Sequence, residues 1–389
     1  MPIKNRFSDL SGEITAWRRD FHAHPELRFE ETRTAGLVAE RLKGFGCDEV
    51  VEGFGKTGVV AVIRGRGQAS GRTIGFRADM DALPITEATG LEYASETAGT
   101  MHACGHDGHT SMLLGAAQYL AETRNFDGTV VLVFQPAEEG GGGARAMLKD
   151  GLMERFEIDE IYGMHNWPGI EAGQFAMREG PQMAAADSFE VRVRGKGGHG
   201  AMPHIAVDTS LVASHIIIAL QSVVSRNVDP LKAAIVSVCG IKSDTDTYNV
   251  IPDEVLLKGT TRYLHPDVQG VIRERMQALV TQTAAAYGAR AELTYFVGVP
   301  PTMNAPEAVT HAAEAALAVT GKAPLEIDPV MPAEDFSEML LVRPGAYVFI
   351  GNGDSADLHN PLYNFNDDIL PVGASFFAEL AENRMPLAD

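Results

Sequence analysis

Cysteine is scarce in this chain of 389 residues, with three copies at positions 47, 104 and 239. An odd and small number excludes a disulfide framework and is typical of a protein kept in a reducing compartment. Basic residues are also few, with 32 lysines and arginines against 52 acidic residues and a formal net charge of −20. This balance argues against nucleic acid or an anionic membrane as a partner, because either would need a basic face.

Long apolar runs are missing as well. We find no stretch that approaches the roughly 20 apolar residues of a membrane span, and residues 1–14 lack the apolar segment of a secretory signal. We therefore expect a cytoplasmic protein with no membrane partner. Its length predicts two or three domains, since a domain has roughly 150 residues.

The first part of the chain alternates helical and strand patterns. Apolar residues at helical spacing predict helices, and short runs rich in β-branched residues predict strands. Alternation at this length predicts an α/β domain with a mostly parallel sheet. The predicted helices cover 10–21, 30–42 and 111–120, and the predicted strands cover 58–63, 73–76, 129–134 and 160–164.

The middle of the chain has a different pattern. Residues 188–194 (SFEVRVR) alternate strictly between apolar and polar, as in a strand with one face in water. From there the order strand, helix, strand, strand, helix, strand predicts a ferredoxin-like α+β unit. The α/β pattern then resumes with a helix over 306–320 and a strand over 346–350. We predict a catalytic domain in two parts, 1–184 and 298–389, interrupted by an inserted domain at 185–297.

Metal-binding residue types gather in the segment 101–109 (MHACGHDGH), which holds three histidines, one cysteine and one aspartate. Cys104 and His106 are spaced so that a thiolate and an imidazole can reach one ion. Asp107 is placed to accept an imidazole N–H and orient a ligand. The alternatives are solvated loop histidines, or Cys104 as a nucleophile with a histidine base.

Two adjacent carboxylates, Glu138 and Glu139, follow the strand 129–134 directly. Ligands collect at the carboxyl ends of parallel strands, so one carboxylate can bind a metal while its neighbour activates a water. His165 and His359 follow two further predicted strands, where each alone is more often structural than a ligand. Because these signals fall at several strand ends of one sheet, together they predict a metal site on one rim.

A glycine-rich stretch in the inserted domain, 195–200 (GKGGHG), has the spacing of a dinucleotide-binding loop. The next predicted helix begins only after His204, so no helix N-terminus is placed to hold a pyrophosphate. We interpret the stretch as a glycine loop that carries His199 toward another surface.

On these residues the sequence resembles the dinuclear metal aminoacylase/carboxypeptidase family. Within it, the similarity is to the branch of hippurate hydrolases, N-acetyl-amino-acid deacetylases and auxin–amino acid conjugate hydrolases. The matching stretches span nearly the whole chain in order: 18–27 (RRDFHAHPEL), 76–84 (FRADMDALP), 101–109, 135–140 (QPAEEG), 163–168 (GMHNWP), 195–204, 249–252 (NVIP), 334–336 (EDF) and 359–360 (HN).

The resemblance implies a zinc-peptidase-like catalytic domain, with the ferredoxin-like insert as the dimerisation (lid) domain of a homodimer. It implies two divalent ions per subunit, a general base at Glu138, and His199 reaching toward the active site of the partner subunit. Relatives have His-x-Asp where this chain has Asp79-Met80-Asp81, so we treat these two aspartates as structural or as supports of the ligands. The implied metal ligands are Cys104, His106, Glu139, His165 and His359.

The expected reaction is hydrolysis of the amide bond of an N-acyl amino acid to a carboxylic acid and a free amino acid. Glu138 takes the proton of the attacking water, and His199 stabilises the oxyanion. Asn249 and Arg262 are candidates to bind the substrate carboxylate, with a surface salt bridge as the alternative role of Arg262. The ligand types suit Zn²⁺, with Mn²⁺, Co²⁺ or Ni²⁺ as alternatives. A metallo-dipeptidase or carboxypeptidase is the alternative activity, and a non-catalytic binding protein is the alternative class.

Overall fold

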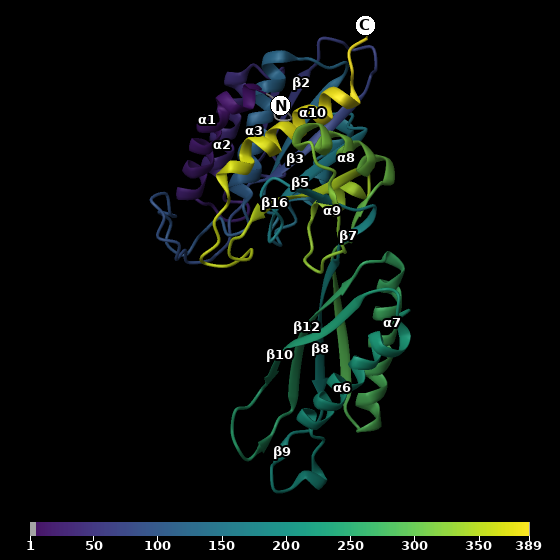
Figure 1. Cartoon of the computed structure of the whole chain (residues 1–389). Coiled ribbons are helices and arrows are strands. Elements are labelled where there is room, and N and C mark those ends of the chain that lie inside the picture. The colour runs from purple at the N-terminus through teal and green to yellow at the C-terminus, as the bar shows by residue number, and fades with distance from the viewer. Residues whose placement is uncertain (1–4, 389) are drawn as a thin grey trace. The chain divides into compact units, whose positions relative to one another are not determined.

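A computed structural model describes residues 5–388 (Figure 1). Residues 1–4 and 389 lie outside the described residues. They are the outer ends of the two predicted parts of the catalytic domain, 1–184 and 298–389. The chain divides into two compact units. The first unit comprises the residues up to Gly180, Met303–Asp328 and the residues from Asp335 on, and the second comprises Pro181–Thr302 and Pro329–Glu334.

An eight-stranded sheet forms the centre of the first unit, in the order β1-β2-β4-β3-β5-β16-β6-β15. The four central strands β4, β3, β5 and β16 are parallel, and β2 joins β4 in the antiparallel direction. The predicted α/β class with a largely parallel sheet is confirmed. The strands are β1 (Glu49–Phe54), β2 (Gly58–Arg64), β3 (Thr73–Asp79), β4 (Thr129–Gln135), β5 (Glu160–Pro168), β6 (Phe175–Met177), β15 (Leu325–Glu326) and β16 (Gly345–Gly353).

Helices cover the sheet of the first unit, and their apolar stripes make its core. All seven residues of β3 are buried, as expected for a strand with both faces covered. Helices α1, α3 and α10 pack against one another (Figure 1). The helices are α1 (Asn5–Ala23), α2 (Thr32–Phe45), α3 (His106–Thr123), α4 (Gly143–Lys149), α5 (Leu152–Arg155), α8 (Pro306–Thr320), α9 (Phe336–Leu340) and α10 (Leu370–Arg384), with the 3₁₀ turn η2 (Asp367–Ile369).

Each predicted helix and strand of this unit is present. Helix α8 has the predicted bounds, and each of the other elements has at least one end shifted by a few residues. Two of these shifts bear on the metal ligands. Helix α3 begins at His106, whereas we expected the helix to start at residue 111. Strand β5 continues to Pro168, so His165 lies inside the strand and not beyond its end. Strands β1, β6 and β15, helix α10 and the short helices α4, α5 and α9 were not predicted.

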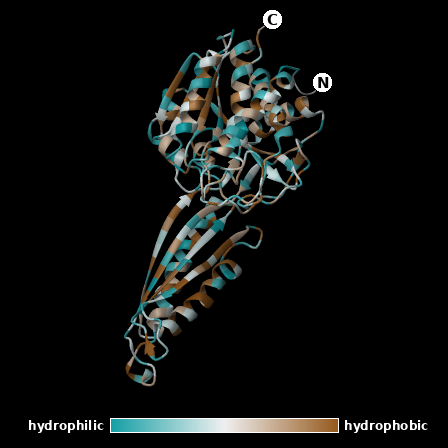
Figure 2. Cartoon of the chain, turned by 90° about the vertical axis from the view of Figure 1, so that its left-hand side faces the viewer, coloured by the Kyte–Doolittle hydropathy of each residue, from teal (hydrophilic) through white to brown (hydrophobic). Residues whose placement is uncertain are grey.

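The second unit has a four-stranded antiparallel sheet in the order β10-β12-β8-β13. Its element order β8-α6-β10-β12-α7-β13 is that of a ferredoxin-like unit. Alternate residues of β8 are buried, and its strands mix polar and apolar segments in Figure 2. The elements are β8 (Ala185–Arg194), β9 (Gly198–His199), η1 (Pro203–Ile205), α6 (Thr209–Asn227), β10 (Ala234–Ser243), β11 (Val250–Ile251), β12 (Glu254–Tyr263), α7 (Pro266–Ala286) and β13 (Arg290–Val299), and β7 (Gly180–Met183) and β14 (Thr302–Asn304) lie where the chain passes between the units.

Helix α6 is long and apolar enough to cross a membrane by length and composition alone. We had expected no stretch of this kind. Core helices pass the same test, and Val212, Ile216 and Leu220 of α6 belong to the hydrophobic core of the second unit. Packing therefore accounts for one apolar face of this helix.

Candidate metal centre

The five predicted metal ligands lie in the first unit, and the structure brings them to one place. Ligand atoms of Cys104, His106 and His165 lie within 4.8 Å of one another, and so do those of Cys104, Glu139 and His359. A further group of the same kind joins His106 to Glu138 and Glu139. The donors therefore form two adjacent triads that share Cys104, which is the arrangement that two neighbouring ions require.

A glycine aligns the first two ligands. Gly105, between Cys104 and His106, has a φ of 88° and immediately precedes α3. A Cβ atom at this position would lie 2.2 Å from Oδ1 of Asn166. Only glycine meets both conditions, because it alone has neither a Cβ nor a steric penalty at positive φ. The tight turn lets Cys104 and His106 reach the same place from either side of the helix start.

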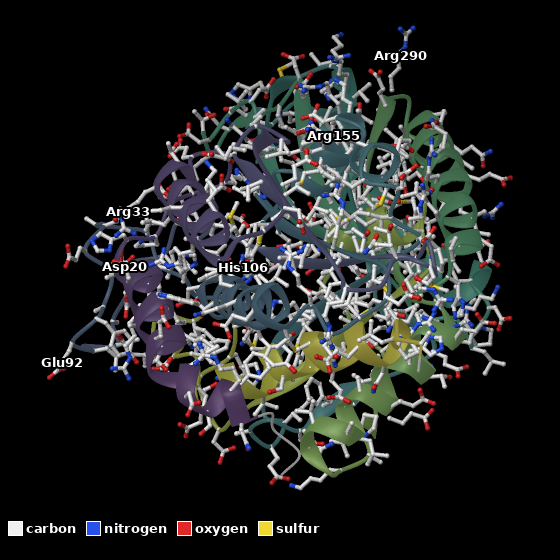
Figure 3. The ribbon with its side chains drawn as sticks, turned by 90° about the horizontal axis from the view of Figure 1, so that it is seen from above. Asp20, Arg33, Glu92, His106, Arg155 and Arg290 are labelled. Atoms are coloured by element: carbon white, nitrogen blue, oxygen red, sulfur yellow. The ribbon has the colours of Figure 1, made fainter. Side chains whose placement is uncertain are left out.

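In each of two histidines, a hydrogen bond at one ring nitrogen leaves the other ring nitrogen available to a metal. Nδ1 of His106 lies 2.8 Å from the carbonyl oxygen of Asp81, and Nδ1 of His165 lies 2.6 Å from that of Asn166. Because a carbonyl only accepts, the neutral rings carry their proton on Nδ1 and a lone pair on Nε2. Nε2 of His106 is buried and has no hydrogen-bond partner within residues 5–388. These rings thus fit a metal ion, and His106 is labelled in Figure 3.

The electrostatics of the centre call for a cation. Burial raises the pKa of the Cys104 thiol well above its usual range, and the nearby Glu139 carboxylate raises it further. Although burial opposes a charge on His106, the Asp79 carboxylate and Cys104 hold the pKa of its imidazole well above the usual value. Burial lowers the pKa of His165 well below its usual value, with the neighbouring His109 adding to the effect. A thiolate at this buried place needs a positive charge beside it, which a divalent ion supplies.

The turn after β4 holds the two adjacent carboxylates by its main chain. The N–H groups of Glu138 and Glu139 donate to the two carboxylate oxygens of Asp81, each at 3.0 Å. The N–H of Ala137, a residue with a φ of 52°, donates to the buried Glu31 at 2.8 Å. Oε1 of Glu138 accepts a hydrogen bond from the main-chain N–H of Asp335 at 3.3 Å. Hydrogen bonds therefore hold the main chain of both glutamates and one carboxylate oxygen of Glu138.

The fifth ligand comes from the loop after β16. His359 has a φ of 62°, which is uncommon for a residue with a side chain. Its N–H donates to the carbonyl oxygen of Ala103 at 2.8 Å, which ties the loop to the Cys104 segment. Nε2 of His359 lies 3.0 Å from Oε1 of Glu139, and the His359 side chain is 52% exposed. The centre is therefore open to solvent on the side of His359.

Comparison with known proteins agrees with this geometry. The model of peptidase family M20/M25/M40 matches residues 75–383. The chain belongs to this family. Its predicted family membership is thereby confirmed.

Three relatives of the M20/M25/M40 family illustrate the similarity. The chain is 45% identical to a hippurate hydrolase of Campylobacter jejuni over 96% of this chain and 97% of the relative. It is 40% identical to an N-acetylcysteine deacetylase of Bacillus subtilis over 94% of each chain. It is 38% identical to an IAA-amino acid hydrolase of Arabidopsis thaliana over 94% of this chain and 85% of the relative.

A solved structure of an M20 protein from Bacillus subtilis, described as a dinuclear metal-binding peptidase, superposes with a TM-score of 0.86. It is 35% identical, and the match covers 97% of this chain and 99% of that one. Together with the Cys104-centred triads, this similarity makes the centre a divalent-metal site.

The second unit of this M20/M25/M40 protein carries the other predicted site residues at two separate places. His199 in β9 pairs with Val250 in β11, and the N–H of Gly200 donates to the carbonyl oxygen of Asn249 at 2.7 Å. His199 and Asn249 therefore lie together. Arg262 lies at the opposite end of β12 from the β9–β11 ribbon, since it pairs with Ala186 at the start of β8.

The half-buried guanidinium of Arg262 donates to the hydroxyl of Thr260 and to the carbonyl oxygen of Thr261. Within the described part of the chain, no carboxylate forms an ion pair with Arg262. Burial accordingly lowers the pKa of Arg262. The alternative of a surface salt bridge is therefore not observed among the described residues, and the charged group that acts on Arg262 is the carboxylate of Asp187.

Asp107 does not orient a metal-binding histidine, and that prediction is wrong. Its Oδ2 instead accepts a hydrogen bond from Nδ1 of His22 at 2.8 Å and lies 3.4 Å from Nη1 of Arg18. The reason is the early start of α3: consecutive helical residues point about 100° apart, so Asp107 faces α1 while His106 faces the ligands. The carbonyl groups of Asp81 and Asn166 orient the imidazoles instead.

Several residues outside the proposed ligand set lie beside the centre. Asp81 holds the glutamate turn, as described above, and Oδ1 of Asp79 accepts a hydrogen bond from Nδ1 of the buried His109 at 2.6 Å. These contacts are of the kind expected of a support, and Asp79 also forms a group of possible metal donors with His106 and His109. His109 and Asp335 had no predicted role, although 101–109 and 334–336 are both among the stretches on which the family resemblance depends.

Proposed function

We propose that this protein is a metal-dependent amidohydrolase that cleaves the amide bond of N-acyl amino acids. The observation that carries this proposal is the pair of ligand triads sharing Cys104, with Glu138 beside them. The names of the three relatives describe enzymes acting on an acyl group joined to an amino acid: hippurate, N-acetylcysteine and IAA-amino acid conjugates. The products are a carboxylic acid and a free amino acid.

The ligand set suggests how two ions are shared. Cys104, His106 and His165 would hold one divalent ion, and Cys104, Glu139 and His359 the other. One thiolate among imidazoles and a carboxylate suits Zn²⁺, and Mn²⁺, Co²⁺ or Ni²⁺ are the alternatives that metal availability allows. When bound, the ions polarise the scissile carbonyl and lower the pKa of the attacking water.

Glu138 is the general base of this proposal. Its carboxylate is half-buried beside the ligands, so it can contact a water at the centre while remaining accessible to substrate. It accepts the proton of the attacking water and then donates it to the leaving nitrogen. Two hydrogen bonds hold Glu138 in this position. Its Oε1 accepts from the N–H of Asp335, and its main-chain N–H donates to the carboxylate of Asp81.

The second unit supplies substrate contacts in a homodimer. We propose that His199, on the exposed β9–β11 ribbon, stabilises the oxyanion in the active site of the second subunit, with Asn249 beside it. Arg262, at the other end of β12, would bind the substrate carboxylate. The separation of these residues within one unit supports a composite site built from two chains. Exposed apolar side chains such as Ile218 (69%) and Ile241 (66%) support association through this unit.

A substrate panel with the metal-reconstituted protein tests the reaction. Acetyl, benzoyl and indole-acetyl groups are each joined to several amino acids, so that the acyl group and the amino acid vary independently. We expect turnover of N-acyl amino acids that is lost on chelation and restored by a divalent metal.

The same panel includes dipeptides and longer peptides. A higher kcat/KM for these would make the protein a metallo-dipeptidase or carboxypeptidase. Inhibition by thiol alkylation together with indifference to chelators would point to a thiol hydrolase and overturn the proposal. Metal binding without turnover of any substrate would indicate a binding protein.

A further inference from the structure

Arg77 is a fully buried cation behind the metal centre, two residues before the end of strand β3. Its Nη1 donates to Oδ2 of Asp79 at 2.7 Å, and its Nη2 donates to Oδ1 of Asp335 at 3.2 Å. Its Nε donates to Oε1 of Gln135 at 2.9 Å. The Arg77 and Asp79 side chains are 0% exposed, and that of Asp335 is 2% exposed. One guanidinium thus joins the ends of β3 and β4 to the start of α9.

Asp79 connects Arg77 to the imidazole side of the centre. Its second oxygen, Oδ1, accepts the hydrogen bond from His109, and Oδ2 lies 3.7 Å from Nε2 of His106. Nε2 of His109 in turn lies 3.1 Å from the main-chain nitrogen of Asn166, the residue after His165. A shift of Asp79 would therefore be transmitted to the rings of two proposed metal ligands.

Asp335 connects Arg77 to the base side of the centre. Besides Arg77, its carboxylate accepts from Nε2 of Gln135 at 2.7 Å and from the N–H of Ala144 at 3.0 Å. With its side chain fixed by these three donors, Asp335 presents its own main-chain N–H to Oε1 of Glu138 at 3.3 Å. The position of that N–H depends on the carboxylate that Arg77 holds.

We propose that Arg77 is a positioning residue that sets Glu138 relative to the metal ligands. This inference rests on the proposed role of Glu138 as the base. Arg77 touches neither substrate nor ions, because it is buried beneath both aspartates. It acts by holding two carboxylates that would otherwise repel each other, one of which supports the imidazoles and the other the base. Reaction between a water and the scissile carbonyl depends on such alignment to within about 1 Å.

The Arg77→Lys variant tests the geometry while keeping the charge. A guanidinium presents donors in a planar fork, whereas an ammonium is a compact point charge that cannot reach Asp79, Asp335 and Gln135 together. We expect kcat to fall by about 10- to 100-fold, the usual effect of losing a residue that supports the ligands. KM should change by less than about threefold, since Arg77 makes no contact with substrate. Metal content should stay unchanged when the metal is supplied in excess.

Asp335→Asn is the second variant, and it keeps the main-chain N–H and the size of the side chain. If Arg77 and Asp335 act through their mutual contact, kcat of the double variant will be no lower than kcat of the more impaired single variant. The matched control is Arg384→Lys, since Arg384 makes a bidentate contact with Glu160 at 3.1 and 3.2 Å, at the opposite end of β5 from His165. This control is expected to keep the wild-type kcat even where the melting temperature changes.

Three results would overturn the proposal. The first is a folded, metal-loaded Arg77→Lys protein with kcat within about threefold of wild type. The second is an equal loss of kcat in Arg384→Lys, and the third is a loss of kcat in the double variant equal to the product of the two single losses. Should Arg77→Lys fail to fold, the kcat of Asp335→Asn decides by the same limit. Failure of the proposed function is recognised separately, because the wild-type protein would then not turn over N-acyl amino acids, and failure of the proposed base would leave Glu138→Gln active. An inactive Glu138→Gln beside a fully active Arg77→Lys would remove this inference alone.

Discussion

The Sγ atom of Cys104 lies 3.4 Å from Nε2 of His165, with both side chains buried. The imidazole donates its Nδ1 proton to the carbonyl oxygen of Asn166, so the lone pair on its Nε2 accepts a hydrogen bond from the protonated thiol of Cys104. Burial keeps this thiol protonated in the absence of a cation. A metal ion bound between Cys104 and His165 would therefore replace this contact with two metal–ligand bonds.

Cys104→Ser should weaken metal binding by more than about 100-fold, because it removes a ligand of both triads and not just a residue behind a ligand. A serine hydroxyl stays protonated where a thiol becomes a thiolate, so it cannot replace the lost charge. Competition with a chelator, followed by metal analysis, measures the change. Cys239→Ser is the control, since Cys239 is exposed on β10. Equal metal retention in both variants would exclude Cys104 as a ligand.

Glu138→Gln should lower kcat by about 10²- to 10⁴-fold, because the amide keeps the shape of the carboxylate but cannot take up a proton. Metal content should stay unchanged, since Glu139 supplies the proposed ligand. Steady-state kinetics and metal analysis on the same preparation check both parts. Glu154→Gln, an exposed substitution in α5, should leave kcat at the wild-type value. Substantial turnover by Glu138→Gln would assign the base to another residue.

Gly105→Ala should lower both stability and metal affinity. The new Cβ would lie 2.2 Å from Oδ1 of Asn166 and 2.8 Å from the hydroxyl of Tyr363, at a φ of 88°. The positive φ alone costs about 1 kcal/mol for a residue with a side chain, and the clash adds to it. Urea unfolding and chelator competition measure the two effects.

Gly12→Ala provides the opposite expectation. Gly12 lies inside α1, and a Cβ there would meet nothing within 4 Å. This variant should gain about 0.5–1 kcal/mol of unfolding free energy, because alanine is the better helix former. A loss in Gly12→Ala as large as that in Gly105→Ala would mean that the turn before His106 has no special requirement for glycine.

The proposed ligands could be found from sequence because they fall in short local patterns. Cys104 and His106 are two positions apart, Glu138 and Glu139 are adjacent, and parallel strands carry their carboxyl ends to one rim. These patterns can be recognised without knowing the exact residues at which a helix or strand begins and ends. The errors in the predicted element ends therefore did not affect the choice of ligands. The direction of Asp107 was mispredicted because it depends on where α3 begins, and one residue turns a side chain by about 100°.

The role of Arg77 could not be predicted in the same way. Its partner Asp335 lies 258 positions further along the chain, and Gln135 lies 58 positions away. The contact arises only when β3, β4 and α9 pack together, and no local periodicity encodes it. The charge of Arg77 did not predict its role either, because an arginine in an apolar strand can also belong to an exposed strand at the edge of a sheet.

Arg262→Ala should raise KM for N-acyl amino acids by at least about tenfold, while KM for the corresponding amides changes little. The reason is that a charge-assisted hydrogen bond contributes about 1.5–3 kcal/mol, whereas an uncharged amide forms no ion pair. Paired kinetics on the acid and amide of one substrate measure the difference. Arg290→Ala, an exposed arginine at the start of β13, should affect neither substrate. An equal rise of KM for acid and amide would contradict the assigned role.

His22 should make stability depend on pH in the alkaline range. Its ring is fully buried, with Nδ1 2.8 Å from Oδ2 of Asp107 and Nε2 3.3 Å from Oε1 of Glu87. Burial alone would lower the pKa of His22, but the two carboxylates outweigh it and raise the pKa to about 9. Since an unfolded histidine has a pKa of about 6.5, the protonated ring stabilises the folded state. The contribution is fully present below pH 6.5 and is lost as the pH rises through 9.

The expected loss is about 3 kcal/mol of unfolding free energy between pH 6.5 and 9.5, from a pKa difference of about 2.5. Urea unfolding at a series of pH values and constant metal concentration measures it. His22→Gln should flatten this part of the profile, because glutamine does not titrate. His24→Gln is the control, since His24 is half-exposed and bonds mainly to the carbonyl oxygen of Asp20. Parallel profiles of wild type and His22→Gln would show that Asp107 and Glu87 are neutralised by another group, for which Arg18 is the nearest candidate.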